Sequence, residues 1–283
     1  MGSRRPAVLN LRLDSRRDSA GLVRAALGGL STPFALRSEL VDDLKTAISE
    51  ACNNAVEHAY GGQNGVIAVH VDVGFEGVEA SVRDWGSGFQ LVAPKEDRLG
   101  VGLPVINALA SRAEFLTASG KGTEVRMAFD MRHNPRRDAL LARLGESEDL
   151  EAWTPWRRGL SGDVVVSLLP RELLSGVLES LANALAARAR FSLELFTDVY
   201  LLTKAVAAHV QEAASSGRVS FAMTASDQQL DLSIGPLRGG TADALREQLG
   251  ELADEVAPES LEHSELVRVV ARGGGRIPRP VHG

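Results

Sequence analysis

The 283-residue sequence contains one cysteine, Cys52, so no disulfide can form within the chain. Because Cys52 lies inside an apolar helical pattern, we interpret it as a small core residue in a reducing compartment rather than a nucleophile. No group of cysteines and histidines has the spacing of a zinc site. No apolar run approaches the roughly 20 residues of a membrane helix, and residues 1–15 lack the apolar core of a signal peptide. We therefore expect a cytoplasmic protein with no membrane contact.

An excess of positive charge is also missing. The chain has 31 lysines and arginines against 37 aspartates and glutamates, which gives a formal net charge of −6. General nucleic-acid binding needs a basic stripe, so we do not expect direct DNA binding. The phosphate-loop pattern GxxxxGK[ST] is absent, and no GxGxxG follows a predicted strand. The 44% hydrophobic and 24% charged content is that of a globular protein, and the length allows two domains.

The most informative stretch is residues 48–60, ISEACNNAVEHAY, which lies at the end of a predicted helix. Glu50, Asn54 and His58 are each four positions apart, so they stack on one helical face. Apolar side chains form a different face of the same helix. A polar stripe of this kind is typical either of a binding site or of an ordinary solvated surface, and the helix alone leaves both interpretations open.

The hydrophobic periodicity of the first half predicts alternating strands and helices. We expect strands at residues 8–13, 66–73, 78–83, 113–118 and 123–129, and helices at 19–30, 38–60 and 101–110. Strand, helix, helix, hairpin, loop, helix and hairpin follow one another in that order. This order predicts an α/β fold, a two-layer sandwich in which helices cover one face of a sheet.

The second half of the chain repeats this order. Its expected strands are residues 163–169, 219–224, 230–234 and 266–270, and its expected helices are 171–190, 193–215 and 241–256. A shift of about 150 residues aligns the two sets and places His209 opposite His58, which indicates an internal repeat. We therefore predict two tandem two-layer sandwiches, a first domain at residues 1–131 and a second at 163–272, followed by a disordered tail at 273–283. The linker between them, residues 132–162, is expected to contain a short helix at 139–144 and two tryptophans that pack on a domain surface.

Three glycine-containing motifs follow the polar helix in the first half. They read DWGSG at residues 84–88, GVG at 100–102 and GT at 122–123. Each is weak alone, because such runs are common in turns. Together they fit a phosphate-containing ligand: glycines let the backbone approach a ligand closely, and a helix that begins at residue 100 offers free amide groups to phosphate. Asp84, at a strand end, could accept a hydrogen bond from an exocyclic amine.

Residues 5–130 resemble the Bergerat-fold (GHKL) ATPases, which include gyrase, the histidine kinases and MutL. The resemblance rests on four features that follow one another in the same order as in that family: Glu50 with Asn54, the DxGxG motif, the GxG motif, and Gly122-Thr123. SEACNNAVEHAY, a short lid and GVGLPVINALA are most similar to the anti-sigma factor serine/threonine kinases of bacterial sporulation and stress responses. Histidine kinases usually carry an acceptor-histidine helix before the ATPase domain, and gyrase and MutL types carry a transducer domain. We expect neither here.

The resemblance implies catalysis with ATP, ADP and Mg²⁺. Asn54 would hold Mg²⁺, for which an amide oxygen is a suitable ligand. Glu50 would be the general base that takes a proton from a serine or threonine hydroxyl. Arg98 would reach the γ-phosphate and offset charge in the transition state, with Lys95 as a weaker candidate for that role.

The resemblance also implies how the nucleotide is held. Asp84 would bind the adenine amine, and Thr123 would help through a water molecule. His58 and Tyr60 are expected to brace the helix end rather than to do chemistry. The glycines of the cofactor site would be Gly86, Gly88, Gly100, Gly102 and Gly122.

Two features depart from the family pattern. The lid, residues 89–99, is shorter than in many relatives, which puts the phosphotransfer rate in question, and Asn53 stands where these kinases often have threonine. In the second half, Leu201 and Ala205 are opposite Glu50 and Asn54, and residues 234–240, IGPLRGG, replace the DxGxG motif. This copy is therefore expected to be degenerate and to lack a nucleotide site.

The resemblance implies a kinase that binds a sigma factor and phosphorylates an anti-anti-sigma protein of the STAS type. The alternative is a switch that binds nucleotide and a partner but transfers no phosphate. Relatives of this kind typically pair as dimers through the sheet edge and neighbouring helices. Because a degenerate copy that keeps its apolar pattern can still pack, we expect the second half to dock on the first as an intramolecular pseudo-dimer. The alternative is that the second half carries a surface for docking a partner, and the sequence does not choose between the two.

Overall fold

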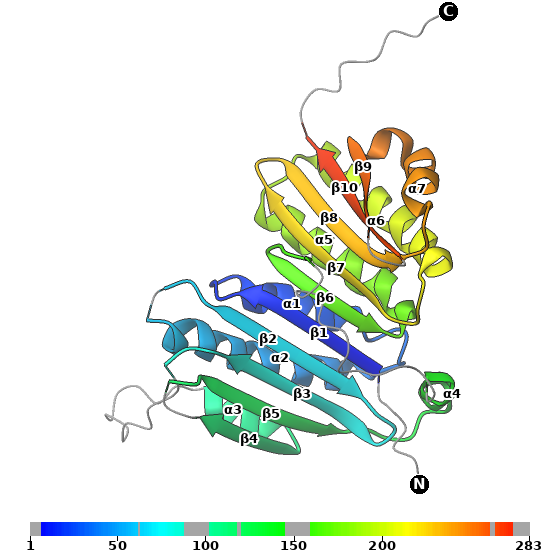
Figure 1. Cartoon of the computed structure of the whole chain (residues 1–283). Helices are drawn as coiled ribbons and strands as arrows, with labels where there is room; N and C mark the ends of the chain where they lie inside the picture. The colour runs from blue at the N-terminus through cyan, green and yellow to red at the C-terminus, as the bar shows by residue number, and fades with distance from the viewer. Residues whose placement is uncertain are drawn as a thin grey trace, which may run out of the picture.

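The computed structural model describes residues 7–61, 63–87, 102–117, 120–144, 159–260 and 264–273. Its strands form one ten-stranded sheet in the order β4-β5-β3-β2-β1-β6-β7-β8-β10-β9. Helices from both halves of the chain lie behind this sheet in Figure 1, on one of its faces. The two-layer α/β arrangement predicted from the sequence is confirmed.

The first half begins with β1 and ends with β5, and its strands β2, β3 and β5 alternate between buried and more exposed residues, whereas β4 at the edge of the sheet has no buried residue. In β3, for example, Val78, Ala80 and Val82 are buried and the intervening side chains are more exposed, which is the period-2 pattern of a sheet covered on one face. The elements are β1 (Ala7–Asp14), α1 (Ser19–Gly28), α2 (Ser38–Asn54), a π-helical turn (Ala55–Ala59), β2 (Val66–Val73), β3 (Gly77–Asp84), α3 (Gly102–Leu109), β4 (Arg112–Thr117) and β5 (Thr123–Asp130).

Helix α4 (Pro135–Leu144) connects the halves and is longer than the six-residue helix expected from the sequence. Its buried Arg137 donates to the backbone carbonyls of Phe75 and Arg132, both at 2.9 Å. The elements of the second half are β6 (Val164–Leu169), a 3₁₀ turn (Arg171–Leu173), α5 (Leu174–Arg188), α6 (Leu193–Ala213), β7 (Val219–Ser226), β8 (Gln229–Leu237), α7 (Thr241–Leu249), a 3₁₀ turn (Gly250–Leu252), β9 (Glu255–Ser260) and β10 (Glu265–Arg272).

The expected helix over residues 241–256 is wrong in its second part. Helix α7 ends at Leu249, where Gly250 takes a φ of 52° that favours glycine. The chain then forms β9, which the sequence did not indicate because Pro258 interrupts a short run of mixed polarity. Proline is tolerated there because β9 is the last strand of the sheet and pairs only with β10.

The two halves have the same topology. Counted from the centre of the sheet, the first half reads β1-β2-β3-β5-β4 and the second reads β6-β7-β8-β10-β9. The helix layer follows the same rule: α1 contacts α2, which contacts α3, while α5 contacts α6, which contacts α7. Each half therefore places its third helix over the end of the sheet that is far from the centre (Figure 1).

The centre of the molecule is the junction of the halves. Strands β1 and β6 pair antiparallel, and the pairs that face the helices are buried leucines and valines: Leu9 with Leu168, Leu11 with Val166 and Leu13 with Val164. Above them α1 lies against α5. At one end of this junction, Arg188 forms ion pairs with Asp18 and Asp163, and the pair with Asp18 is 3.2 Å long.

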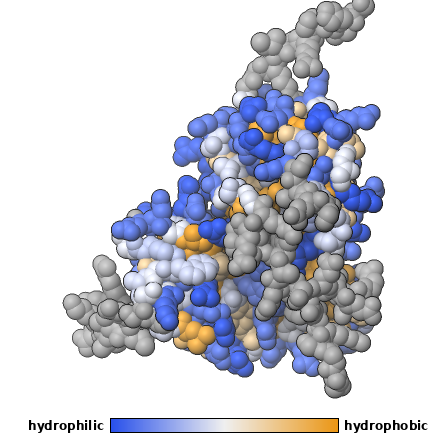
Figure 2. All heavy atoms as spheres, viewed as in Figure 1, coloured by the Kyte–Doolittle hydropathy of each residue, from blue (hydrophilic) through white to orange (hydrophobic). Residues whose placement is uncertain are grey.

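The face of the sheet that the helices do not cover carries polar side chains in the first half. His70 and Asp72 of β2 project there, with His70 Nε2 2.8 Å from a carboxylate oxygen of Asp72, and Arg126 of β5 pairs with Glu124 at 2.9 Å. Figure 2 shows the described part of this face as mainly hydrophilic, with small apolar patches. No helix in the described ranges is both long enough and apolar enough to span a membrane.

A glycine pair at the junction provides a test of the packing. A Cβ atom at Gly29 would lie 2.6 Å from the backbone of Gly176 and Val177. Gly29→Ala therefore forces α1 away from α5, and we expect a loss of about 1–3 kcal/mol in the free energy of unfolding, as for other overpacked sites. Urea denaturation followed by circular dichroism measures this loss.

Gly21→Ala is the matched control, because Gly21 is an exposed residue of α1 and a methyl group added there would meet nothing within 4 Å. It should stabilise the protein by about 0.5–1 kcal/mol through helix propensity. Equal effects of the two substitutions would contradict the close helix contact.

Candidate functional site

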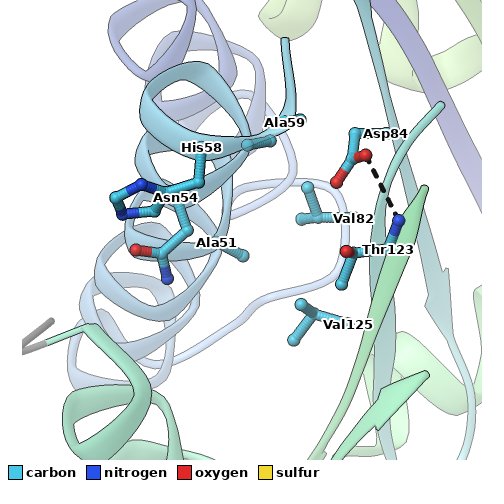
Figure 3. Close-up of a pocket in the computed structure, with 9 residues that line it drawn as sticks. Ala51, Asn54, His58, Ala59, Val82, Asp84, Thr123 and Val125 are labelled. Carbon is cyan, nitrogen blue, oxygen red and sulfur yellow. Dashed lines mark hydrogen bonds between the residues drawn. The ribbon is translucent and has the colours of Figure 1, made fainter. Parts of the chain in front are cut away.

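A small pocket opens between the end of α2 and the strands β3 and β5. Figure 3 shows Asn54 and His58 on the helical side, with Asp84 and Thr123 across from them on the strands. Small apolar side chains lie between these two polar groups. The lining residues are Ala51, Asn54, Ala55, His58, Ala59, Val82, Asp84, Thr123 and Val125.

The helical wall arises from the division of α2 into two faces. Leu44, Ile48 and Cys52 are fully buried against the sheet, and this burial fixes the helix, while Glu50 and Asn54 remain half-buried beside them. The α-helix ends at Asn54 and continues as a π-helical turn over Ala55–Ala59. The sequence indicated an unbroken α-helix to residue 60, because a four-residue spacing does not distinguish one π turn from α. Single π turns occur often at functional sites.

Asp84 is the central group of the strand wall. It is 4% exposed, and its Oδ1 accepts two backbone hydrogen bonds, from Gly86 N at 2.9 Å and from Thr123 N at 3.2 Å. These bonds fix the carboxylate at the end of β3 and tie the start of β5 to it. Within the described residues, Oδ2 has no hydrogen-bond partner. The pocket therefore offers one charged acceptor to a donor on a ligand.

Two glycines make this arrangement possible. Gly122 has a φ of 82°, and a Cβ there would lie 2.1 Å from the carbonyl oxygen of Asp84. A Cβ at Gly86 would lie 2.0 Å from the carbonyl oxygen of Ala59. Both glycines thus allow close contacts within the wall of the pocket, so part of the motif's glycine content serves the protein's own backbone.

The end of the helix is braced against the strands. Ser87 N donates to Ala59 O at 2.9 Å. The hydroxyl of Tyr60 donates to Val66 O at 2.5 Å and accepts from Trp85 N at 2.9 Å. Tyr60 therefore has the bracing role expected of it. His58 instead lines the pocket with a side chain that is 51% exposed.

The pocket brings together three of the predicted site residues, Asn54, Asp84 and Thr123. Glu50 lies one helical turn before Asn54 on the same helix but is not among the lining residues. Gly102 is the first residue of α3. The predictions for Gly88, Lys95, Arg98, Gly100 and the lid, residues 89–99, fall outside the described residues, as do those for Trp153 and Trp156.

The apolar lining was not identified from the sequence. Ala51, Ala55 and Ala59 occur at every fourth position, so small side chains run along the side of the helix that faces the strands. Val82 and Val125 come from neighbouring strands, β3 and β5, and pair with each other in the sheet. The alanine spacing was the available signal: small residues beside Asn54 leave room for a flat ligand against the two valines.

The single cysteine is a core residue, as the sequence indicated. Cys52 is completely buried, and burial raises the pKa of its thiol to about 12 because the interior disfavours the thiolate. A protonated, inaccessible thiol is not a nucleophile. The side chain contributes to packing behind the pocket.

Comparison with protein families identifies the region that contains this pocket. Residues 13–129 match the family described as the histidine kinase-like ATPase domain. Among curated proteins, the chain is 33% identical over 93 residues to the serine-protein kinase RsbW of Bacillus pumilus, covering 32% of this chain and 57% of that protein. It is 27% identical over 130 residues to the anti-sigma F factor of Caldanaerobacter subterraneus, covering 42% and 91% respectively.

The chain spans 57% and 56% of the length of the RsbW proteins of Bacillus pumilus and Bacillus velezensis. Among solved structures, the chain is similar to the RsbU and RsbW domains of a Mycobacterium tuberculosis protein, with 29% identity and a TM-score of 0.34. That similarity covers 44% of this chain and 34% of the other. The residues matched by the family, 13–129, include the helix and the strands that form the pocket.

The brace at the helix end predicts a stability effect. Tyr60→Phe removes both hydrogen bonds of the hydroxyl and leaves Trp85 N without its partner, so we expect a loss of about 1–3 kcal/mol in the free energy of unfolding. Tyr200 is the matched control, because it is the chain's only other tyrosine and its side chain is partly exposed on α6. Tyr200→Phe should stay within about 0.5 kcal/mol of wild type in urea denaturation. A Tyr60→Phe protein as stable as wild type would refute the brace.

The buried thiol predicts a specific pH dependence. In the folded chain the pKa of Cys52 is about 12, against an ordinary value of 9.0. The raised pKa means that stability is fully present below about pH 9 and is lost as pH rises toward 12, because only the unfolded chain releases the proton, at up to about 1.4 kcal/mol per pH unit. Cys52→Ala should be less stable at pH 7 but should lose stability less steeply between pH 9 and 11. Parallel stability curves for the two proteins would contradict the assignment.

Proposed function

We propose that this chain is an ATP-dependent serine/threonine protein kinase of the anti-sigma-factor type, on the premise that residues 13–129 belong to the histidine kinase-like ATPase family. The observation that carries the proposal is the pocket itself. A buried carboxylate, Asp84, whose Oδ2 has no hydrogen-bond partner in the described part of the chain, faces an amide side chain, Asn54, across walls of alanine and valine.

The residues present fit a bound nucleotide. The apolar walls suit a flat base, and Oδ2 of Asp84 can accept a hydrogen bond from an exocyclic amine. Thr123 lines the same strand wall of the pocket and is its second polar residue. Asn54 offers an amide oxygen, which is a suitable ligand for Mg²⁺. We therefore assign ATP or ADP with Mg²⁺ to this pocket.

The proposed chemistry assigns one role to each side chain. Bound Mg-ATP would supply the phosphoryl group. Glu50 would take the proton from the attacking hydroxyl of a serine or threonine, and its place one turn before Asn54 puts the base next to the metal ligand. Asp84 would orient the base of the nucleotide. Arg98 is proposed to offset charge on the transferred group.

The partners follow from the curated relatives. One relative is called a serine-protein kinase and another an anti-sigma F factor. We propose that this chain likewise binds a sigma factor and phosphorylates an anti-anti-sigma protein of the STAS type. Nucleotide state would then determine which partner is bound.

A second function is favoured by one observation. Glu50 does not line the described pocket, so the chain could bind nucleotide and a partner without phosphate transfer. Such a switch needs Asn54 and Asp84 but not Glu50. The difference between the two functions therefore depends on the carboxylate of Glu50.

We also propose that the second half, residues 163–272, is a degenerate copy of the first. The equal strand order and helix order of the halves support this. Asp84 pairs with Ile67, the second residue of β2, while Gly235 pairs with Ser220, the second residue of β7. The position of the adenine-binding carboxylate thus carries a glycine. The paired halves would form an intramolecular pseudo-dimer.

A phosphotransfer assay tests the proposal. With Mg-ATP and the cognate STAS protein, wild type should yield phosphoserine or phosphothreonine. Glu50→Gln should lose about 10²–10⁴-fold in rate because the general base is gone, with nucleotide affinity retained. Asp84→Asn should weaken nucleotide binding about 10–100-fold, because the new amide group opposes the amine of the base.

The matched control is Glu57→Gln, because Glu57 is exposed on the π-helical turn between Asn54 and His58. It should have wild-type rate and affinity. Calorimetry and mass spectrometry supply the two measurements. No phosphorylated product from wild type, together with intact nucleotide binding, would favour the switch; no binding at all would refute both functions.

A further inference from the structure

The second half contains counterparts of the elements that form the pocket. Helix α7 follows β8 as α3 follows β3, and β10 lies beside β8 as β5 lies beside β3. In the first half, the start of the third helix is where the GxG motif would offer amide groups to phosphate. In the second half, the corresponding helix start is described completely, and it is occupied by a side chain of the protein itself.

That side chain is Glu265, the first residue of β10, which is 8% exposed. Its Oε1 accepts a hydrogen bond from Ala242 N at 2.8 Å, and its Oε2 accepts one from Gly240 N at 3.3 Å. Gly240 precedes α7 and has a φ of 83°, a conformation that favours glycine. Two oxygens of one buried anion therefore engage two amide groups at the positive end of the helix.

This arrangement has the chemistry of a phosphate site with the ligand supplied in cis. A helix N-terminus attracts anions because its first amide groups have no partner in the helix and its dipole favours negative charge. The carboxylate of Glu265, on a neighbouring strand, accepts hydrogen bonds from these amide groups and places negative charge at the positive end of the dipole. It does so without any bound ligand. A free phosphate could enter only if the Glu265 carboxylate left, which would leave a charge without its hydrogen bonds in a nearly buried position.

Helix α7 is also attached to its neighbours elsewhere. His209 Nδ1 of α6 lies 2.9 Å from Gln248 Oε1 of α7. Leu237, at the end of β8, is fully buried and bridges to Ala214 just beyond α6. Helix α7 is therefore held to α6, and the end of β8 is held to the residue after α6.

We propose that Glu265 is a built-in substitute for a nucleotide phosphate, which holds the second half permanently in a closed, anion-occupied form. This inference rests on the proposed function, since it takes the first half to be the nucleotide-binding one. The consequence is an asymmetric pseudo-dimer. One nucleotide binds per chain, and only the first half responds to it, while the second half is a fixed partner surface.

Chemical rescue tests the substitution. Glu265→Ala uncovers the two amide groups, and its melting temperature should fall by roughly 3–10 °C. Inorganic phosphate at tens of millimolar, against chloride at equal ionic strength, should restore roughly half of that loss by binding the uncovered helix start. Phosphate binding to the first half is common to all variants, so the difference between variants isolates Glu265.

Two variants complete the design. Glu251→Ala is the control, because Glu251 is an exposed carboxylate in the turn after α7, and its melting temperature and phosphate response should equal those of wild type. Glu265→Gln keeps the shape but loses the charge, and it should show a smaller loss with a smaller rescue. It serves as the test variant if Glu265→Ala does not fold.

The outcomes separate this inference from the proposed function. Rescue by phosphate in the Glu265 variants supports the inference even if wild type transfers no phosphate. A phosphate response equal to that of wild type overturns it. Calorimetry with an ATP analogue on the wild-type chain should give one nucleotide per chain, and two nucleotides per chain would likewise overturn it.

Discussion

The pairing of β1 with β6 is the constraint on which the rest of the structure depends. Each strand would otherwise be an exposed edge carrying a row of leucines and valines, which is a template for aggregation. Their pairing makes one sheet of ten strands and sets α1 against α5, where Gly29 and Gly176 allow the backbones to approach closely. Because the junction occupies the centre, the third helix of each half, α3 and α7, lies toward an outer end of the sheet.

The pocket depends on this placement through α2. The helix is held by its buried face, which packs on the sheet beside α1. Asn54 lies beside this buried face, and the π-helical turn after it ends at Ala59. The next residue, Tyr60, is hydrogen-bonded to β2 and to the residue after β3. A ligand between helix and strands would thus meet two walls whose separation is fixed by packing and by backbone hydrogen bonds.

Much of this could be predicted from the sequence because it depends on local patterns. Alternating polarity identified the strands of the first half, and the motif around Asp84 identified the acceptor in the pocket. Features set by tertiary contact could not be predicted. The π turn has the same residue spacing as an α-helix, and β9 has a sequence without strand character that is stabilised by its edge position on β10. The contact between Gly86 and Ala59 also has no local signal.

The two halves differ in how a buried carboxylate meets two backbone amides. Among the described residues, each half has one buried carboxylate at the end of a strand, Asp84 as the last residue of β3 and Glu265 as the first residue of β10. Asp84 satisfies two backbone amides with Oδ1 alone, which leaves Oδ2 without a partner among the described residues. Each oxygen of Glu265 accepts a hydrogen bond from one backbone amide. In the same framework, Asp84 presents an oxygen that is free of described partners to a donor on a ligand, whereas Glu265 has both oxygens bonded to the start of α7 and is held against that helix. The direction of two backbone amides toward one oxygen or toward two is therefore a structural difference between the halves, and under the proposed function it would separate the nucleotide-binding half from the other.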